Sequence, residues 1–375
     1  MRVLRWLFGL LPVRDRVVFA SPRHGTLEGN LRFLFDAIRR HDGARQPVLL
    51  LEPYAYHLVG KLVYLMRLVR GMYYLSTSRL FVVDNAYFPI HVAPHRRETT
   101  VVQAWHAAGA LKRFGLDGTA DEQDAERAFL HRHYDYVVVA GETSRAPYAS
   151  ALRTPIERVL PLGTPRTDFF FDERAMSLAR GRLLRAFPQL RDRTVVLYAP
   201  TFRGRGEARR AAPGFDARRL RSLLPDSHAL VLKTHPNLDP GATPTDGYDV
   251  VLDPSTEVNE AFTVSDVLVT DYSSSIFEWA LLRRPLVLLV PDLDEYEADP
   301  GLYLDYRTEM IGTQVTDIDG VARAILKGEL DGAAHDAFVA RHLEACDGAA
   351  AGRFVTRFLG AKVQPARLRA DVDDQ

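Results

Sequence analysis

The sequence predicts an α/β protein made of two doubly wound domains. Short apolar runs alternate with amphipathic helical patterns, as in parallel sheets joined by crossover helices. The chain has 375 residues, more than one ordinary domain holds, and a polar stretch over 189–194 after Pro188 separates two such series. We therefore expect an N-terminal domain over 1–188, a C-terminal domain over 189–362 and a polar tail over 363–375.

The first series contains six apolar runs of strand length. They are Arg16–Ala20, Pro47–Leu51, Leu80–Asp84, Thr100–Trp105, Asp135–Ala140 and Val159–Leu162. A helical pattern over 31–40 follows the first run, with Asn30 placed to cap it. Another helix, over 173–187, ends at Pro188 because proline cannot continue a helix. These elements form one complete α/β sheet.

The second series repeats the pattern. Its strands are expected at Val195–Tyr198, Ala229–Lys233, Val250–Leu252, Val267–Thr270 and Leu286–Val290. In open parallel sheets ligands bind beyond the carboxyl ends of the strands. Polar residues just past these strand ends, facing a central cleft between the two domains, are therefore the candidates for chemistry.

Composition excludes several classes of protein. Hydrophobic residues make up 47% and charged residues 26%, so the chain is globular rather than disordered. Forty-eight basic residues balance forty-eight acidic ones, which gives no overall attraction to nucleic acid. The single cysteine, Cys346, excludes a disulfide scaffold and a multi-thiolate metal site, and fits a small buried residue in a reducing compartment.

The apolar N-terminus is interrupted by Arg5 and lacks a small-residue cleavage pattern, so we expect no signal peptide or membrane-spanning helix. Two interpretations of this segment stay open. Arg2 and Arg5 with Trp6 and neighbouring leucines fit a lipid interface, and a strap packed on the domain fits equally well. The apolar stretch over 58–70 has no clean basic face, which favours a core helix.

Candidate residues follow one strand end in the first half of the chain and one at the start of the second half. The run that ends at Trp105 places His106 at a strand end, followed by small residues that permit close approach of a substrate. Past the strand ending at Tyr198, Thr201 offers a hydroxyl and Arg203 a planar cation suited to phosphate. A structural histidine and a surface arginine are the plain alternatives.

Two more strand ends follow. Lys233 and His235 share one side of an extended chain, where two nitrogen donors suit an anion. The strand ending at Thr270 leads into Asp271 and then a helix start. The serines of that helix start are Ser273, Ser274 and Ser275. With Glu278 at capping-box spacing from Ser275, we expect a helix N-terminus that cradles phosphate.

The sequence lacks the usual nucleotide and metal motifs. It has no GxxxxGK[ST] loop, no strand-end GxGxxG and no HExxH. A P-loop NTPase, a nicotinamide enzyme of the usual type and a zinc protease are therefore not supported.

Taken together and in order, the motifs resemble those of the CDP-glycerol glycerophosphotransferase family, the teichoic acid primases and polymerases. The matching elements are Trp105-His106 with Lys112 and Gly115, Pro165 to Asp168, Tyr198 to Arg203, Lys233 to Pro236, Asp266 to Glu278 with Pro285, Asp292 to Tyr296, and Gly301 to Tyr306. Two departures occur: Ala107 replaces the glycine after the motif histidine, and Gly29-Asn30-Leu31 replaces Asp-Asn-Pro.

The resemblance implies a GT-B-like enzyme that transfers a polyol phosphate, glycerol phosphate above all, from a CDP-linked donor to a hydroxyl of a lipid-linked saccharide acceptor. On this basis we predict His106 and His235 as catalytic residues, with His106 as the base. The predicted substrate-binding residues are Thr201, Arg203, Lys233, Asp271, Ser273, Ser274 and Ser275. No cofactor is required, although Mg²⁺ is compatible with the chemistry. We expect a cytoplasmic protein held peripherally on the inner face of the plasma membrane.

Two other functions compete. A GT-B glycosyltransferase or sugar-nucleotide epimerase that uses a UDP-sugar would share the fold. A non-catalytic membrane scaffold would share it too, with Ala107 as a sign of a decayed site. An arginine-rich stretch between Arg203 and Arg221 fits a solvated loop better than an anion-binding surface.

Overall fold

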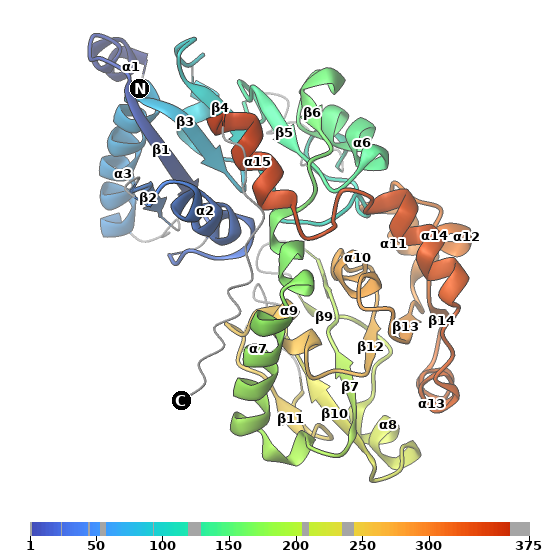
Figure 1. The fold of residues 1–375 in the computed structure, drawn as a ribbon. Coiled ribbons are helices and arrows are strands. Elements are labelled where there is room, and N and C mark those ends of the chain that lie inside the picture. Colours follow the sequence, from blue (N-terminus) through green and yellow to red (C-terminus); the bar gives the residue numbers. More distant parts are fainter. Residues whose placement is uncertain are drawn as a thin grey trace, which may run out of the picture.

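Two parallel sheets, each covered by helices, make up the protein (Figure 1). The computed structural model describes residues 2–23, 25–43, 46–52, 58–92, 94–118, 129–204, 210–234 and 244–360. The expected α/β class with two doubly wound domains is confirmed.

The N-terminal sheet has the strand order β2-β1-β3-β4-β5-β6, and its described pairings are parallel. Its strands are β1 Arg14–Ser21, β2 Val48–Leu51, β3 Ser78–Val83, β4 Thr100–Gln103, β5 Tyr136–Val138 and β6 Val159–Leu160. The six apolar runs predicted from the sequence therefore all fall on strands. They do so because strands buried on both faces are continuous apolar runs.

Helices of the N-terminal domain pack on both faces of this sheet. They are α1 Arg2–Phe8, α2 Gly29–His41, α3 Leu58–Thr77, α4 Phe88–Val92 and α6 Arg145–Ala151, with 3₁₀ helices η1 Gly115–Asp117, η2 Glu142–Ser144, η3 Ile156–Arg158 and η4 Pro165–Phe171. One core cluster contains Phe81 and Tyr148, and the cluster on the other face contains Phe19 and Leu34.

The C-terminal sheet has the order β11-β10-β7-β12-β13-β14, again with parallel pairings. Its strands are β7 Thr194–Tyr198, β10 His228–Leu232, β11 Val250–Val251, β12 Val267–Thr270, β13 Leu286–Leu289 and β14 Thr313–Val315, and a separate hairpin joins β8 Phe202–Arg203 to β9 Arg210–Ala211. The strand order reverses between β7 and β12, as at a Rossmann switch point.

The remaining helices follow residue 172, and all but the last, α15, belong to this half. They are α7 Glu173–Ala186, η5 Pro188–Leu190, α8 Ala217–Leu223, α9 Val258–Phe262, α10 Ser275–Ala280, α11 Leu293–Ala298, α12 Tyr306–Glu309, α13 Ile318–Lys327, α14 Gly332–His342 and α15 Ala350–Leu359. Cys346 is buried in the C-terminal core beside them, as expected.

Two helices lie on the other side of the expected domain division. Leu183 of α7 packs in the C-terminal core, although the sequence-based division assigns it to residues 1–188. Phe354 and Val355 of α15 pack in the N-terminal core, although they belong to the expected domain 189–362. The chain returns to the N-terminal domain at α15. Asp168 holds the start of this helix, because its carboxylate accepts hydrogen bonds from the backbone N–H groups of Ala350 and Ala351 at 3.0 and 2.9 Å. The chain therefore crosses between the sheets twice.

The two domains meet through a close contact and an ion pair. A Cβ atom at Gly109 would lie 2.5 Å from the Phe277 ring of α10, so only glycine fits there. Arg166 of η4 donates to the carboxylate of Glu278, which is fully buried. Phe277 and Glu278 follow one another on α10, so this short helix anchors the interface.

Glu278 does not form the expected capping box with Ser275. Its carboxylate is bonded to Arg166, whereas the α10 N-terminus has Ser274 at its cap without a side-chain cap bond. Leaving a buried carboxylate without a cation costs more free energy than leaving a helix N-terminus without a second hydrogen-bond acceptor. Asn30 likewise lies inside α2 rather than capping it.

We predict that Arg166→Ala destabilises the protein by about 3–5 kcal/mol, because it leaves the buried Glu278 carboxylate without its cation. Urea unfolding measures the change. Arg182→Ala, which breaks an exposed pair with Glu260, is the matched control and should cost under about 1 kcal/mol. Equal effects of the two substitutions would contradict the role given to Arg166.

Candidate active site

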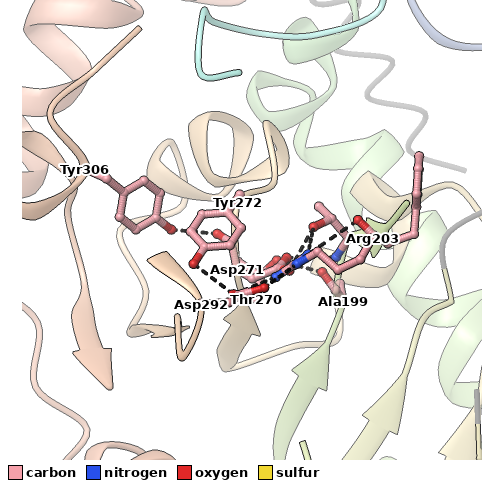
Figure 2. Close-up of polar contacts among 9 residues, drawn as sticks. Ala199, Arg203, Thr270, Asp271, Tyr272, Asp292 and Tyr306 are labelled. Atoms are coloured by element: carbon pink, nitrogen blue, oxygen red, sulfur yellow. Dashed lines mark hydrogen bonds and ion pairs between the residues drawn. The ribbon is translucent and has the colours of Figure 1, made fainter. Parts of the chain in front are cut away.

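Thr201 and Asp271 lie at the switch point of the C-terminal sheet, just past the carboxyl ends of β7 and β12. Figure 2 shows Asp271 with the polar contacts around it. The Asp271 carboxylate accepts the Thr201 backbone N–H and hydroxyl, both at 2.8 Å. A further bond between the same strand ends runs from the Thr270 hydroxyl to the Ala199 carbonyl at 2.6 Å. The sequence-predicted pair is therefore joined, and Thr201 orients Asp271.

Arg203 lies between two carboxylates instead of presenting an open cation. One guanidinium nitrogen donates to Asp271 at 2.8 Å, and two others donate to Asp292 at 2.7 and 3.1 Å. Burial alone would raise the pKa of Asp292, but the hydrogen bonds from Arg203 hold it below its usual range. The same bonds outweigh desolvation and raise the pKa of Arg203. Arg203 organises the site, with its charge balanced by protein groups.

Three tyrosines enclose this network and were not predicted as site residues. The Tyr306 hydroxyl donates to the Asp271 carbonyl at 2.6 Å, and the Tyr272 hydroxyl donates to Asp292 at 3.1 Å. Tyr296 stacks on Tyr272 with 3.8 Å between ring centroids. The sequence contains the Asp292 to Tyr296 spacing and the motif that ends at Tyr306, so these residues could have been predicted as part of the site. The sequence does not show the contact that joins them to Asp271.

Lys233 is bonded to two backbone carbonyls, and its predicted contact with substrate stays a prediction. Its ammonium donates to the carbonyls of Thr234 and Pro254 at 3.0 and 2.9 Å, and burial lowers its pKa. These bonds hold the loop after β10 in place and use two of its three donors. His235 lies outside the described residues, so its predicted place beside Lys233 stays a prediction.

The serine cluster is bonded within itself. The hydroxyls of Ser273 and Ser275 are 2.7 Å apart, and the Ser275 backbone N–H donates to the Ser273 oxygen at 3.2 Å. Ser273 and Ser274 are half-buried, whereas Ser275 is buried. The cluster follows Asp271 and Tyr272 directly, which brings it next to the Arg203 network.

His106 follows a turn at the end of β4. Trp105 adopts a positive φ of 48°, a strained conformation for a large residue, and its ring stacks on His106 and Phe114 at 4.5 and 4.8 Å. Asn30 holds this turn by donating to the carbonyls of Ala104 and Trp105 at 3.0 and 2.9 Å. Asn30 therefore serves the site rather than a helix cap.

The His106 ring contacts the end of the neighbouring strand β3. Its Nδ1 lies 3.3 Å from the backbone carbonyl of Asp84. A carbonyl only accepts, so this bond requires a proton on Nδ1 and places the lone pair of neutral imidazole on Nε2. That tautomer is suited to accept a proton from a substrate hydroxyl.

The small residues after His106 serve a different purpose from the one expected. Ala108 is fully buried in the C-terminal core, and Gly109 lies under Phe277. They allow the loop to pack between the domains instead of leaving room for a substrate. Ala107, which replaces the family glycine, packs against the N-terminal core.

Asp84 is a further titratable group at this strand end. Burial raises its pKa to about 6, partly offset by a hydrogen bond from Ser21 and by the charge of Arg23. Ser21 and Asp84 end β1 and β3, where the order of the N-terminal sheet reverses. Asp84 therefore lies at a reversal of strand order, as Asp271 does, and could have been predicted as a site residue on the same ground.

Three further features concern the described part of the chain. No cluster of three or more His, Cys, Asp or Glu side chains there could hold a metal ion. None of the described helices has both the length and the apolar character needed to cross a bilayer. Arg218, Arg219 and Arg221 lie on α8 rather than in the expected loop, and each forms an ion pair with an aspartate.

We predict that Asp84 makes stability depend on pH. Its raised pKa means that its stabilising contribution is complete below about pH 4 and is lost as the pH rises through about 6. Relative to wild type, Asp84→Asn should therefore gain about 3 kcal/mol in unfolding free energy between about pH 4 and about pH 7. Exposed Glu157→Gln is the control; a pH-independent difference for Asp84→Asn would refute the assignment.

Known proteins match this chain over most of its length. Residues 6–360 match the family model for CDP-glycerol:poly(glycerophosphate) glycerophosphotransferases. The chain is 32% identical to the teichoic acid ribitol-phosphate primase of Bacillus spizizenii, over 96% of this chain and 97% of that protein. It is 26% identical to the teichoic acid glycerol-phosphate primase of Bacillus subtilis, over 69% and 68% of the two chains.

Solved structures share the fold. The wall teichoic acid polymerase TagF superposes with a TM-score of 0.75 at 21% identity, over 95% of this chain and 92% of that chain. A UDP-GlcNAc 2-epimerase from Neisseria meningitidis reaches 0.57 at 11% identity, over 93% and 100%. The fold alone thus fits both kinds of protein, whereas the sequence match is specific: the chain belongs to the CDP-glycerol:poly(glycerophosphate) glycerophosphotransferase family.

Proposed function

We propose that this enzyme transfers a polyol phosphate from a CDP-linked donor to a hydroxyl of a lipid-linked acceptor in teichoic acid synthesis, with release of CMP. The acceptor oxygen attacks the phosphorus that bears the polyol, and the bond from that phosphorus to the bridging oxygen of the diphosphate breaks. The acceptor proton passes to His106 Nε2. The bond between His106 Nδ1 and the Asp84 carbonyl carries this proposal, because it favours the tautomer that acts as a base.

The second domain would hold the donor. Asp271, fixed by Thr201 and Arg203, would orient a donor hydroxyl or the half-buried hydroxyls of Ser273 and Ser274. His235 stays a second catalytic candidate on its sequence position alone. The residues thus divide between the two domains: base on one, donor binding on the other.

Two donors are candidates. The family description names glycerol, and glycerol phosphate is the unit expected from the motifs. Ribitol phosphate is the second candidate, since the relative at 32% identity over nearly the whole chain is a ribitol-phosphate primase, whereas the glycerol-phosphate primase is 26% identical over a shorter span.

CMP release is the first test. With CDP-glycerol, CDP-ribitol and UDP-GlcNAc supplied separately, we expect acceptor-dependent CMP from one CDP-polyol, and expect it to persist in EDTA. His106→Ala should lower kcat by about 10²- to 10⁴-fold, because the base is lost. Exposed His41→Ala is the control.

Other results would redirect the assignment. Turnover of UDP-GlcNAc alone would favour the glycosyltransferase or epimerase reading. A folded wild-type enzyme that is silent with every donor and acceptor would favour the scaffold.

We also propose peripheral attachment to a membrane surface through α1 and the turn that follows it, which contains Leu10. Val3, Trp6 and Leu10 are 69%, 67% and 70% exposed, which is unusual for large apolar side chains so close together. Phe8 packs edge-on against Tyr73, and Arg96 donates to the carbonyls of Gly9 and Leu11. The segment is thus fastened to the domain while its other side stays exposed, which combines the two interpretations of the sequence.

Vesicle binding tests this attachment. Replacing Trp6 and Leu10 together with serine should abolish cosedimentation with phosphatidylglycerol vesicles and leave turnover of a water-soluble acceptor unchanged. Leu326→Ser, at an exposed leucine on α13, is the matched control. Undiminished vesicle binding by the double variant would rule out α1 as the contact.

A further inference from the structure

Lys112 is an N-terminal-domain residue that lies against the C-terminal site. Its backbone forms an antiparallel bridge with Leu302. On either side of that bridge, Arg113 N–H donates to the Gly301 carbonyl at 3.0 Å and Tyr303 N–H donates to the Leu111 carbonyl at 2.9 Å. This short pairing fixes Lys112 relative to the C-terminal domain, and it does so six residues after His106.

The ammonium of Lys112 faces the tyrosine and arginine network. Its Nζ lies 5.3 Å from the centre of the Tyr296 ring, and the Arg203 guanidinium carbon lies 4.9 Å from the same ring. Within the described residues, no hydrogen bond or ion pair reaches Lys112 Nζ. Its contact there is aromatic, and its three N–H donors are not used by any protein group that the structure describes.

The cations near the site differ in this respect. Arg203 is bonded to two carboxylates, and Lys233 donates to two carbonyls. Of these three residues, Lys112 alone keeps its donors for another partner. A desolvated ammonium without an acceptor is costly unless an anion joins it.

We propose that Lys112 binds the diphosphate of the CDP-linked donor and stabilises the charge that develops on the leaving CMP. This inference rests on the proposed function and adds a residue to it. An ammonium that is partly removed from water attracts phosphate more strongly than one at the surface. One loop would then supply both the base, His106, and a cation for the leaving group.

Calorimetric binding of CDP tests the inference without turnover. Lys112→Met keeps most of the side-chain stem and should weaken CDP binding by about 10- to 100-fold, as expected for a lost hydrogen bond to a charged group. Lys112→Arg should restore much of it. Arg113→Ala removes the same charge from the next residue, which is exposed, and should change the affinity less than about twofold.

The outcomes separate the inference from the proposed function. Wild-type CDP affinity in a folded Lys112→Met protein would overturn the role of Lys112, even if turnover were lost. Lys112-dependent CDP binding in an enzyme that releases no CMP would support the nucleotide site while rejecting the transferase assignment. Thermal unfolding of each variant confirms that it is folded.

A pH series gives a second readout. Burial lowers the pKa of Lys112 to about 8, with Arg203 lowering it further and Asp271 raising it. Three neighbouring groups titrate outside the pH range of Lys112. Burial raises the pKa of Tyr272 and of Tyr296, and the pKa of Asp292 is held below its usual range.

Wild-type CDP affinity should therefore fall, by up to about tenfold per pH unit, as the pH rises above the pKa of Lys112 in the free protein, and should level off above the pKa in the complex, which bound phosphate moves upward. Lys112→Arg should flatten this fall, because arginine stays charged. The same slope in both proteins would contradict the proposal.

Discussion

The loop from Ala104 to Arg113 packs between the two domains and fixes His106 and Lys112 relative to the C-terminal sheet. It leaves β4 through the strained turn at Trp105, presents His106, passes Gly109 under Phe277 and ends in the pairing of Lys112 with Leu302. Each step limits the next. A residue larger than glycine at 109 would separate the loop from α10 and with it the two halves of the site.

The C-terminal half of the site is held by opposing charges. Asp271 and Asp292 would repel one another without Arg203, and Arg203 would be costly to bury without them. The Tyr272 hydroxyl also donates to Asp292, and the Tyr306 hydroxyl donates to the Asp271 backbone carbonyl. These bonds hold the network in place, and the Arg203 charge is balanced within it. On this account Lys112, carried by the other domain, completes the site only when the domains are in contact.

Much of the fold could be predicted because buried parallel strands have a simple sequence pattern, as Val267–Thr270 and Leu286–Leu289 illustrate. β14 was missed because Thr313–Val315 is a short, half-buried strand without an apolar run. The placement of α15 could not be predicted, since an amphipathic helix shows that it has an apolar face and not which sheet that face covers.

Of the site, strand-end residues such as His106 and Asp271 followed from topology. The roles of Glu278, Asn30 and Lys233 did not, because their partners are Arg166, the turn at Trp105 and the Pro254 carbonyl, which depend on tertiary contacts.

In the proposed enzyme, one loop of the N-terminal domain acts on a donor held by the C-terminal domain. A crystal structure with a non-hydrolysable CDP-polyol analogue, in which a methylene group replaces the bridging oxygen, would show this arrangement. We expect diphosphate oxygens within hydrogen-bond distance of Lys112 Nζ and the polyol-bearing phosphorus facing His106 Nε2. An analogue bound with its diphosphate away from both side chains would rule the arrangement out.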